Sequence, residues 1–546
     1  MTKKILLLLA MFMVNHFVFA GLHNLQETIR NYIESGPVTT RYIIDNEMLY
    51  SSQVLPRFYL QRSFEPAWIS NDKLNQHANA MIKAIRDATE HGLEPADYHL
   101  SLIEKYENVM KQQASADLQV QMKLEILLTD AFMLFGSHLY FGKVDPEKVK
   151  AEWKIQRKEP ELRLDIRLQE ALSKNDIQGA FHELTPRIKS YEKLKTRLAF
   201  FRGIETQEWN IIPFEGAIKT GTQSRQLPAC RKRLKLLGYE VSELSSEWYD
   251  DDFERTVKRF QLNNGLNPDG VIGRMTTEAM NIHPTKRIET IRVNMERIRW
   301  LPLKFPNRFI LVNIANAELD LIEGSDTLTS MRAIVGRHYR RTPIFSANMT
   351  YLVFSPTWTV PPGILRNDIL PELKKGPEYL DRKNMRILRP DGTEVDYASI
   401  NWETISTTNF PYMVRQNPGP DNALGRVKFM FSNQYNVYIH DTPTRGLFAQ
   451  EDRALSSGCI RIEKPFELAL TLLAANPQWT PERINAAMNS AREQTVTLPT
   501  ALPVVMVYFT AWTDGADKIQ FRKDVYNRDA PVMQALLQKP VDHVVR

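Results

Sequence analysis

The chain has 546 residues, of which 43% are hydrophobic, 10% aromatic and 25% charged, and this balance excludes collagen-like, low-complexity and largely disordered proteins. Its net charge is only +6, without the dense basic block that a nucleic-acid groove needs, so we expect no nucleic-acid partner. Two cysteines, Cys230 and Cys459, are too few for a disulfide scaffold or a cysteine-cluster zinc site. We predict no metal or cofactor, and about three or four domains at roughly 100–200 residues each.

The first 20 residues predict a secretory signal peptide. Lys3 and Lys4 precede an apolar run over residues 5–14, which is too short for a comfortable membrane span, and Ala20 is a small residue suited to cleavage. The alternative is an uncleaved membrane anchor, because Val18 is larger than the residue usual at that position. In both cases the bulk of the chain lies outside the cytoplasm, and we expect no later stretch to cross a bilayer.

Residues 21–210 are predicted to form a mainly helical domain. Apolar residues recur at helical spacing over 81–88, and this helix ends near Gly92. The same pattern continues over 122–135. We interpret these stripes as packing residues. The histidines of the region lack metal-ligand spacing and are interpreted as structural or surface residues: His91, His99, His138 and His182.

Residues 215–283 are predicted to form a compact domain of three helices. Cys230 lies on the apolar face of the first helix, which makes it most simply a small buried hydrophobic residue. The motifs Leu236-Leu237-Gly238-Tyr239, Phe260-Gln261 and residues 265–276 match the pattern of the peptidoglycan-binding domain family, which this segment resembles over nearly its whole length. Residues 248–252 depart from the Gly-rich turn of that family, so a spacer that has lost binding is the alternative.

After a linker around residues 284–306, the apolar pattern changes from helical spacing to alternation. Alternating residues over 308–322 predict a pair of strands, and more short β runs follow, so we expect a mostly β domain over 308–528. Residues 366–414 are predicted to be an insertion that forms a lid over a site, and residues 529–546 a C-terminal tail. The predicted fold class is therefore multidomain α+β.

A histidine and a cysteine of the β domain indicate nucleophilic chemistry. His440 ends a predicted strand, and Cys459 follows 19 positions later in the segment Ser456-Ser457-Gly458-Cys459-Ile460-Arg461. A free thiol, with a pKa of about 8.5, is only a few per cent thiolate at neutral pH, so a neighbouring base and Arg461 would raise its reactivity. Gly458 lets a substrate carbonyl approach the backbone. Cys459 or His440 alone would be interpreted as a structural residue, but together they predict a nucleophile and its base.

This domain resembles the catalytic domain of the L,D-transpeptidase (YkuD-type) family, in which a His follows a strand and a Ser/Thr-x-Gly-Cys-x-Arg motif holds the nucleophile. The match extends to Gly336, Thr342-Pro343 and residues 355–362 and 415–425. With its helical region, peptidoglycan-binding-like domain and insertion, the chain is similar to the large periplasmic subgroup called YcbB-like. Ser457 departs from the smaller members, which commonly have His there. His338 is a second histidine that could approach the site.

The resemblance implies acyl transfer in peptidoglycan. Cys459 would attack the third-residue carbonyl of a tetrapeptide stem, release D-Ala and pass the acyl group to an amine of another stem, which forms a 3-3 cross-link. His440 would carry the proton, oriented by the main-chain carbonyl of Asp441 or, as a testable variant, by its side chain. The amides of Gly458 and Cys459 and the hydroxyl of Tyr438 would stabilise the oxyanion.

Four residues are the predicted substrate-binding residues: Tyr438, Ser457, Arg461 and Trp358. Arg461 either holds the catalytic loop or meets a substrate carboxylate. Trp358 either forms a wall of the pocket or is a core aromatic residue.

The implied partners are peptidoglycan stems, as donor and as acceptor, and carbapenems as acylating agents; protein partners are unknown from the sequence. The implied compartment is the periplasm, with anchoring in the inner membrane if the signal is not cleaved. Three alternatives stay open: an L,D-carboxypeptidase that uses water, an enzyme that anchors a protein lysine, and a non-catalytic wall-binding scaffold. The predicted lid argues against water as acceptor because a lid excludes solvent. A papain-like protease does not fit, because its chain order differs.

Overall fold

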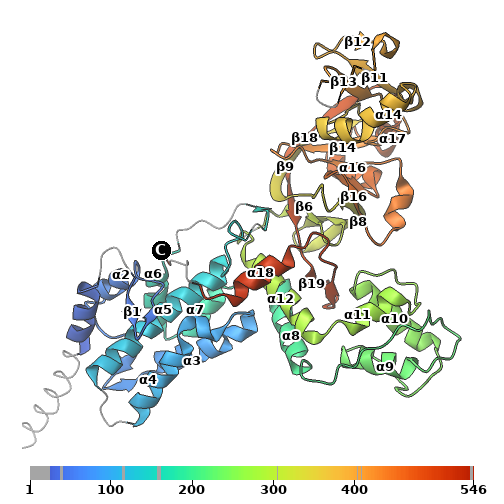
Figure 1. Ribbon diagram of the computed structural model, residues 1–546. Coiled ribbons are helices and arrows are strands. Elements are labelled where there is room, and N and C mark those ends of the chain that lie inside the picture. Colours follow the sequence, from blue (N-terminus) through green and yellow to red (C-terminus); the bar gives the residue numbers. More distant parts are fainter. Residues whose placement is uncertain are drawn as a thin grey trace, which may run out of the picture.

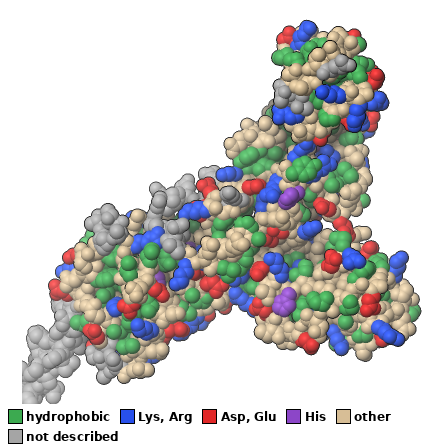
Figure 2. Space-filling model, in the orientation of Figure 1, with side chains coloured by type: hydrophobic (Ala, Val, Ile, Leu, Met, Phe, Trp, Pro, Cys, Tyr) green, Lys and Arg blue, Asp and Glu red, His purple; other side chains and the backbone are tan. Residues whose placement is uncertain are grey.

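The computed structural model describes residues 25–36, 41–112, 117–149, 151–155, 162–303, 305–402, 404–406, 409–540 and 545. Figure 1 shows three lobes: a helical N-terminal domain, a small helical domain, and a β domain with an inserted segment at its far end. Figure 2 shows basic and acidic side chains interspersed over the visible face. The predicted multidomain α+β class is confirmed, whereas the predicted signal peptide over residues 1–20 lies outside the described residues.

The N-terminal domain is built from helices that surround one long buried helix, α5. Helix α3 continues as the 3₁₀ turn η1, and Gly92 ends it at φ +72°, as predicted from the sequence. The elements are a helix over 25–34, β1 (Ile43–Ile44), β2 (Glu47–Met48), α2 (Leu55–Gln61), β3 (Ile69–Ser70), β4 (Lys73–Leu74), α3 (Gln76–Arg86), η1 (Asp87–His91), η2 (Pro95–Tyr98), α4 (Leu100–Gln112), α5 (Leu118–Phe141), β5 (Trp153–Lys154), α6 (Leu164–Lys174), α7 (Ile177–Leu184) and α8 (Lys189–Gly203).

Helix α5 is long and apolar enough to cross a membrane by length and composition, contrary to the expectation from the sequence. It has 24 residues, and 89% of its most apolar 18-residue window is buried inside the protein. Its side chains belong to the large core that the N-terminal domain shares with the β domain. Its apolar side chains are therefore explained by packing in the core of this domain.

The histidines of this domain make packing contacts. The ring of His99 bonds Glu47 at 2.6 Å and Asp130 at 2.8 Å, and these carboxylates raise its pKa to about 9 against the opposing effect of burial. Asp130 also accepts from the amide of Tyr50 at 2.9 Å. The buried charges are thus paired with one another and with the backbone, as burial requires.

The small lobe consists of three helices, as predicted: α9 (Leu227–Leu236), α10 (Asp251–Asn263) and α11 (Arg274–Asn281). They surround a separate core that includes Leu227, Cys230 and Phe260. Cys230 is free and 1% exposed, and burial raises its pKa to about 12. Its thiol is therefore a packing group and not a reactive one.

The predicted linker over residues 284–306 is wrong in its first part, because residues Pro284–Arg299 form the 16-residue helix α12. Most of its side chains are buried although many are charged. Glu296 shows why such a sequence can be buried: its carboxylate accepts from Arg299 Nη2 at 2.6 Å, from the amide of Val144 at 2.7 Å and from the indole of Trp300 at 3.1 Å. The charges that suggested an exposed linker satisfy one another in the interior.

The β domain is built on a sheet that closes on itself. Its strands follow the order β14-β15-β17-β8-β7-β6-β18-β9, and β14 also pairs with β9. From the N-terminal domain, β5 joins the edge of β9, with Trp153 opposite Ile344. The elements are β6 (Arg308–Asn313), β7 (Glu318–Glu323), β8 (Asp326–Gly336), β9 (Ile344–Phe354), β14 (Val427–Phe431), β15 (Ile439–His440), η5 (Arg445–Ala449), β16 (Ala454–Ser456), β17 (Ile460–Ile462), α16 (Pro465–Leu473), α17 (Pro481–Met488), β18 (Gln494–Val507), β19 (Ala511–Thr513) and β20 (Ile519–Phe521).

The insertion is larger than the predicted residues 366–414 and has a core of its own. We call residues 358–416 the inserted subdomain, since their sheet runs in the order β10-β13-β11-β12 and packs on an apolar cluster separate from that of the closed sheet. Figure 1 shows this unit at the end of the β domain away from the N-terminal lobe. Its elements are β10 (Trp358–Thr359), α13 (Pro362–Ile364), η3 (Leu365–Ile369), α14 (Leu370–Lys375), α15 (Tyr379–Arg382), β11 (Met385–Leu388), β12 (Glu394–Val395), η4 (Tyr397–Ser399) and β13 (Met413–Gln416).

The predicted C-terminal tail over residues 529–546 contains a packed helix, α18 (Asp529–Leu537). Val532, Met533 and Leu536 are buried in it. Asp529 accepts from Arg297 of α12 at 2.6 Å. The segment is too short for periodicity alone to reveal a helix, but its apolar residues at positions i, i+1 and i+4 fit one buried face.

We expect Glu296→Ala to lower the free energy of unfolding of the whole chain by about 3–5 kcal/mol, because it leaves Arg299 buried without its carboxylate. Urea denaturation followed by far-UV circular dichroism measures the change. The matched control is Glu289→Gln, which breaks an exposed pair with Lys286 on the same helix and should shift stability by less than about 0.5 kcal/mol. Equal effects of the two substitutions would contradict the role of Glu296.

Candidate active site

The pairing of two short strands brings the predicted site residues together. Strand β15 lies parallel to β17, with Ile439 opposite Ile460 and His440 opposite Arg461. Both isoleucines are 0% exposed and belong to the core. Because side chains alternate along a strand, the flanking residues at 438, 440, 459 and 461 share the opposite face. The rings of Tyr438 and His440 lie accordingly with their centroids 5.6 Å apart.

The thiol of Cys459 is half-buried and free. It donates to the main-chain carbonyl of Asn436 at 3.7 Å, and the hydroxyl of Tyr438 acts on its pKa. Burial raises the pKa of Cys459 above its usual range, against the opposing effects of Tyr438 and of the charge on Arg461. The group is thus a neutral thiol that needs a base to become a nucleophile.

The imidazole of His440 is buried and held by main-chain oxygens. Its Nδ1 lies 2.6 Å from the carbonyl oxygen of Asp441, and the carbonyl of Leu424 is a second main-chain group that acts on the pKa of the ring. Burial lowers the pKa of His440 to about 3, assisted by the charge of Arg461 and opposed by the two carbonyls. A proton on Nδ1, donated to Asp441, leaves Nε2 with its lone pair, which is the form that can accept a proton.

The side chain of Asp441 is not a third member of a triad. Its carboxylate accepts from the amide of Arg426 at 2.9 Å and from the guanidinium of Arg445 at 2.9 Å. Of the two variants expected from the sequence, the main-chain carbonyl is therefore the one that orients His440, and the carboxylate instead fixes the loop that follows Gly425.

The amide of Gly458 is not free to bind an oxyanion as predicted, because it donates to the hydroxyl of Ser456 at 3.0 Å. That hydroxyl in turn donates to the carbonyl of Cys459 at 2.6 Å. Gly458 has φ +117°, a conformation that side-chain-bearing residues rarely adopt, so glycine is required by the backbone at this position. For an oxyanion, the groups that remain are the amide of Cys459 and the hydroxyl of Tyr438.

The predicted substrate-binding residues lie around this centre. Tyr438 is half-buried, and Cys459 and Trp358 both act on the pKa of its hydroxyl. Trp358 packs against the core of the inserted subdomain, as expected for a core aromatic residue, and its role as a wall of the pocket stays a prediction. Ser457 is exposed and accepts from Arg340 Nη1 at 2.8 Å.

Arg461 and His338 differ in their relation to the site. The Nε atom of Arg461 is buried and has no hydrogen-bond partner among the described residues. Its charge acts on both His440 and Cys459. His338 is exposed and its ring lies 3.3 Å from the carbonyl of Val525, away from the thiol contacts described above.

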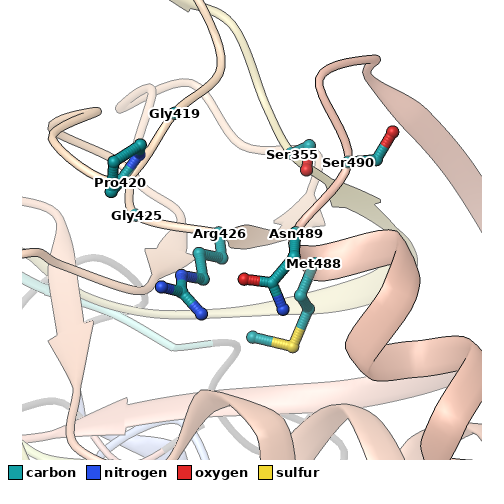
Figure 3. Close-up of a pocket in the computed structure, with 8 residues that line it drawn as sticks. All are labelled: Ser355, Gly419, Pro420, Gly425, Arg426, Met488, Asn489 and Ser490. Atoms are coloured by element: carbon teal, nitrogen blue, oxygen red, sulfur yellow. The ribbon is translucent and has the colours of Figure 1, made fainter.

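A cavity of about 210 Å³ lies between the loop over residues 419–426 and the end of α17 (Figure 3). Its volume is below the range of about 300–1,000 Å³ that ligand pockets usually have, so we assign no substrate to it. It is lined by Ser355, Gly419, Pro420, Gly425, Arg426, Met488, Asn489 and Ser490.

Sequence reasoning missed three participants of the site. Leu424 acts through its carbonyl, which no side-chain motif can signal. Thr342 was noted only as part of a match, yet its hydroxyl donates to the carbonyl of Gly458 at 2.8 Å and fixes the catalytic loop. Arg340 lies far from the motif in sequence, and only the fold brings it to Ser457. Within the described ranges no group of three or more His, Cys, Asp or Glu side chains could hold a metal ion.

Three parts of the chain match family models. Residues 307–483 match the L,D-transpeptidase catalytic domain (YkuD), residues 225–280 a peptidoglycan binding domain, and residues 53–198 a scaffold domain. A protein of Haemophilus influenzae named "Putative L,D-transpeptidase" is 37% identical over 244 residues, which are 45% of this chain and 49% of the relative. The chain thus spans about half the length of this curated relative.

Solved structures with similarity include an L,D-transpeptidase from Xylanimonas cellulosilytica, at 14% identity over 54% of this chain and 99% of that chain, with a TM-score of 0.18. L,D-transpeptidase 3 from Mycobacterium tuberculosis, in complex with a faropenem-derived adduct, is 14% identical over 38% of this chain and 62% of that chain, with a TM-score of 0.17. These scores are too low to carry an argument. The family models and the Haemophilus relative bear out both resemblances: the chain contains an L,D-transpeptidase catalytic domain (YkuD) and, beside it, a peptidoglycan-binding domain.

Proposed function

We propose that the protein is a cysteine-dependent L,D-transpeptidase that forms 3-3 cross-links between peptidoglycan stems. The observation that carries the proposal is the common face of β15 and β17, with a thiol, an imidazole, a phenol and a guanidinium on adjacent strands of the transpeptidase domain. These groups supply a nucleophile, a base, an oxyanion donor and a carboxylate partner.

In the first half-reaction, His440 takes the proton of the Cys459 thiol while the sulfur attacks the third-residue carbonyl of a tetrapeptide stem. The oxyanion is met by the amide of Cys459 and the hydroxyl of Tyr438. The C–N bond to the terminal D-Ala then breaks, the departing amine takes the proton from His440, and a thioester is left. Arg461, whose Nε lacks a partner among the described residues, is suited to the carboxylate of the departing residue.

In the second half-reaction, an amine of another stem attacks the thioester. His440 takes the proton of this amine, the C–S bond breaks, and the proton returns to the sulfur. The inserted subdomain is joined to the catalytic loop through Arg340, and a lid at this place would favour a stem amine over water by excluding solvent. An L,D-carboxypeptidase or an enzyme that attaches a protein lysine would share the first half-reaction and differ only here.

The peptidoglycan-binding domain supports a cell-wall substrate, and the basic and apolar start of the sequence supports export to the periplasm, by a cleaved signal or an inner-membrane anchor. Carbapenems, which carry a strained acyl group, are proposed as acylating agents of Cys459. A purely wall-binding scaffold is less consistent with the chain, because it would have no need of the buried imidazole beside a cysteine.

We expect Cys459→Ala to abolish turnover and leave the fold intact. Liquid chromatography with mass detection on disaccharide-tetrapeptide tests this, because a cross-linked dimer that lacks one D-Ala identifies transpeptidation, whereas shortened tripeptide alone identifies a carboxypeptidase. Cys230→Ala is the matched control, since this thiol lies in the core of the small lobe and should leave turnover unchanged. Residual turnover in Cys459→Ala would refute the nucleophile.

We expect His440→Ala to slow the release of D-Ala by about 10²–10⁴-fold, which is the usual contribution of a positioned base. Asp441→Asn should change the rate much less, because the main-chain carbonyl that orients His440 stays in place. Stopped assays of D-Ala release measure both variants. A rate near that of the wild type in His440→Ala would indicate another base, with His338→Ala as the next variant to assay.

The acylation rate should be nearly independent of pH between about 7 and 5. The pKa of His440 is lowered to about 3, so the imidazole stays neutral and able to accept a proton until the pH falls towards that value. Intact-protein mass spectrometry of carbapenem acylation measures this half-reaction without the titrating acceptor amine. A loss of rate centred near pH 6.5, the ordinary pKa of histidine, would contradict the buried neutral imidazole.

A further inference from the structure

One guanidinium joins the inserted subdomain to the catalytic loop. Arg340 Nη1 donates to Asp368 Oδ2 at 2.9 Å and to Ser457 Oγ at 2.8 Å. Asp368 belongs to η3 of the inserted subdomain, and Ser457 lies two residues before Cys459. The side chain of Arg340 is 19% exposed, against 46% for Asp368, so the arginine is the better fixed of the two partners.

The segment that carries Arg340 also supports the catalytic loop from beneath its backbone. The amide of Arg337 donates to the carbonyl of Ser456 at 3.0 Å, and the hydroxyl of Thr342 donates to the carbonyl of Gly458 at 2.8 Å. Arg340 acts on Ser457, the residue between these two fixed points. A displacement of Ser457 is therefore transmitted directly to Gly458 and to the amide of Cys459.

A second contact links the inserted subdomain to the other side of the thiol. Trp358 starts the sheet of the subdomain, pairing with Gln416 of β13. Trp358 and Cys459 both act on the pKa of the Tyr438 hydroxyl, so this hydroxyl lies between the subdomain and the thiol. The subdomain thus touches the catalytic centre at two separate places, through a charge on one side and an indole on the other.

The basic side chains of the segment after β8 and the acidic side chain of Asp368 have complementary charges. The segment contributes Arg337, Arg340 and Arg341, and the acidic partner of Arg341 is Glu152 of the N-terminal domain at 3.4 Å. Asp368 is the acidic partner that the inserted subdomain contributes to Arg340. A charge-assisted hydrogen bond of this kind is stronger than a neutral one and depends on geometry.

We propose that Arg340 is a positioning residue that couples the docking of the inserted subdomain, through Asp368, to the geometry of the Cys459 loop, through Ser457. The proposal rests on the proposed function, since the coupling matters for acylation of Cys459 by a stem. When the bond between Asp368 and Arg340 is broken, the guanidinium of Arg340 is no longer oriented towards Ser457. The inserted subdomain then loses one of its two contacts with the residues around Cys459. The thiol then becomes more accessible to small reagents but less well placed for a stem.

The first experiment compares Asp368→Ala with Glu394→Gln in the full-length protein. Glu394 forms an exposed pair with Arg386 at 3.4 Å within the same subdomain, away from the catalytic loop, so its loss is a matched control. We measure hydrogen–deuterium exchange over residues 454–461 and the rate at which iodoacetamide alkylates Cys459, with the buried Cys230 as internal reference. We expect faster exchange and about threefold to tenfold faster alkylation in Asp368→Ala only.

The second experiment separates positioning from structural support. In Asp368→Ala and Arg340→Gln, kcat for D-Ala release should fall about threefold to tenfold while KM changes by less than about twofold, and Arg340→Lys should recover part of the loss, because lysine retains a charged donor. Equal exchange and alkylation in Asp368→Ala and Glu394→Gln would overturn the coupling. A rise of kcat in Asp368→Ala would overturn it as well.

The alkylation and exchange measurements do not depend on the reaction. If the wild-type protein released no D-Ala and Cys459 were not acylated by a carbapenem, the proposed function would fail. A difference between Asp368→Ala and Glu394→Gln in exchange would still establish the coupling in that case. The two proposals therefore fail on different observations.

Discussion

The site depends on the register between β15 and β17. The opposed residues Ile439 and Ile460 are both completely buried, and they fix which residues of each strand face the core. Because side chains alternate, a slip of one residue in either strand would turn a catalytic side chain inward and an isoleucine outward. Burial of two apolar side chains thus specifies the position of the thiol and the imidazole, without any direct bond between the two functional groups being needed to hold the strands.

Burial also sets the charge state of the site. A charged imidazole or thiolate would lose solvation in this position, so the pKa of His440 falls and that of Cys459 rises, and both groups are neutral. In the proposed reaction, charge would develop only as bonds form and break, where the hydroxyl of Tyr438 and the guanidinium of Arg461 would stabilise it. The short hydrogen bond between Nδ1 of His440 and the carbonyl of Asp441 keeps the ring in one orientation. It does so without burying a charged partner beside the imidazole.

The residues that meet at β15 and β17 could be predicted from the sequence better than the domain boundaries. Cys459, His440, Tyr438 and Arg461 were found because a motif fixes residue types at fixed spacing. The role of Gly458 changed because hydrogen bonds of a loop depend on its conformation, and Ser456 takes the amide that a substrate was expected to use.

Helix α18 was missed because it spans only nine residues, and helix α12 was missed for a different reason. A segment rich in charged residues is usually predicted to be exposed to solvent. In this fold, buried charges such as Glu296 and Arg299 instead form ion pairs with one another. Positions that act through a carbonyl, such as Leu424, leave no trace in the type of side chain.

Helix α12 gives the three lobes a fixed relation. Arg292 donates to the carbonyl of Gly92 in the N-terminal domain at 2.9 Å, and Arg287 donates to Asn264 of the small lobe at 2.6 Å. At the β domain, Asn294 donates to the hydroxyl of Thr510 at 2.8 Å. A flexible linker would let a wall-binding domain sample many distances from the active site, with an effective concentration set by linker length. A buried helix with polar contacts to each lobe instead holds the peptidoglycan-binding domain at one separation from Cys459, so under the proposed function binding at this lobe would restrict which stems reach the thiol.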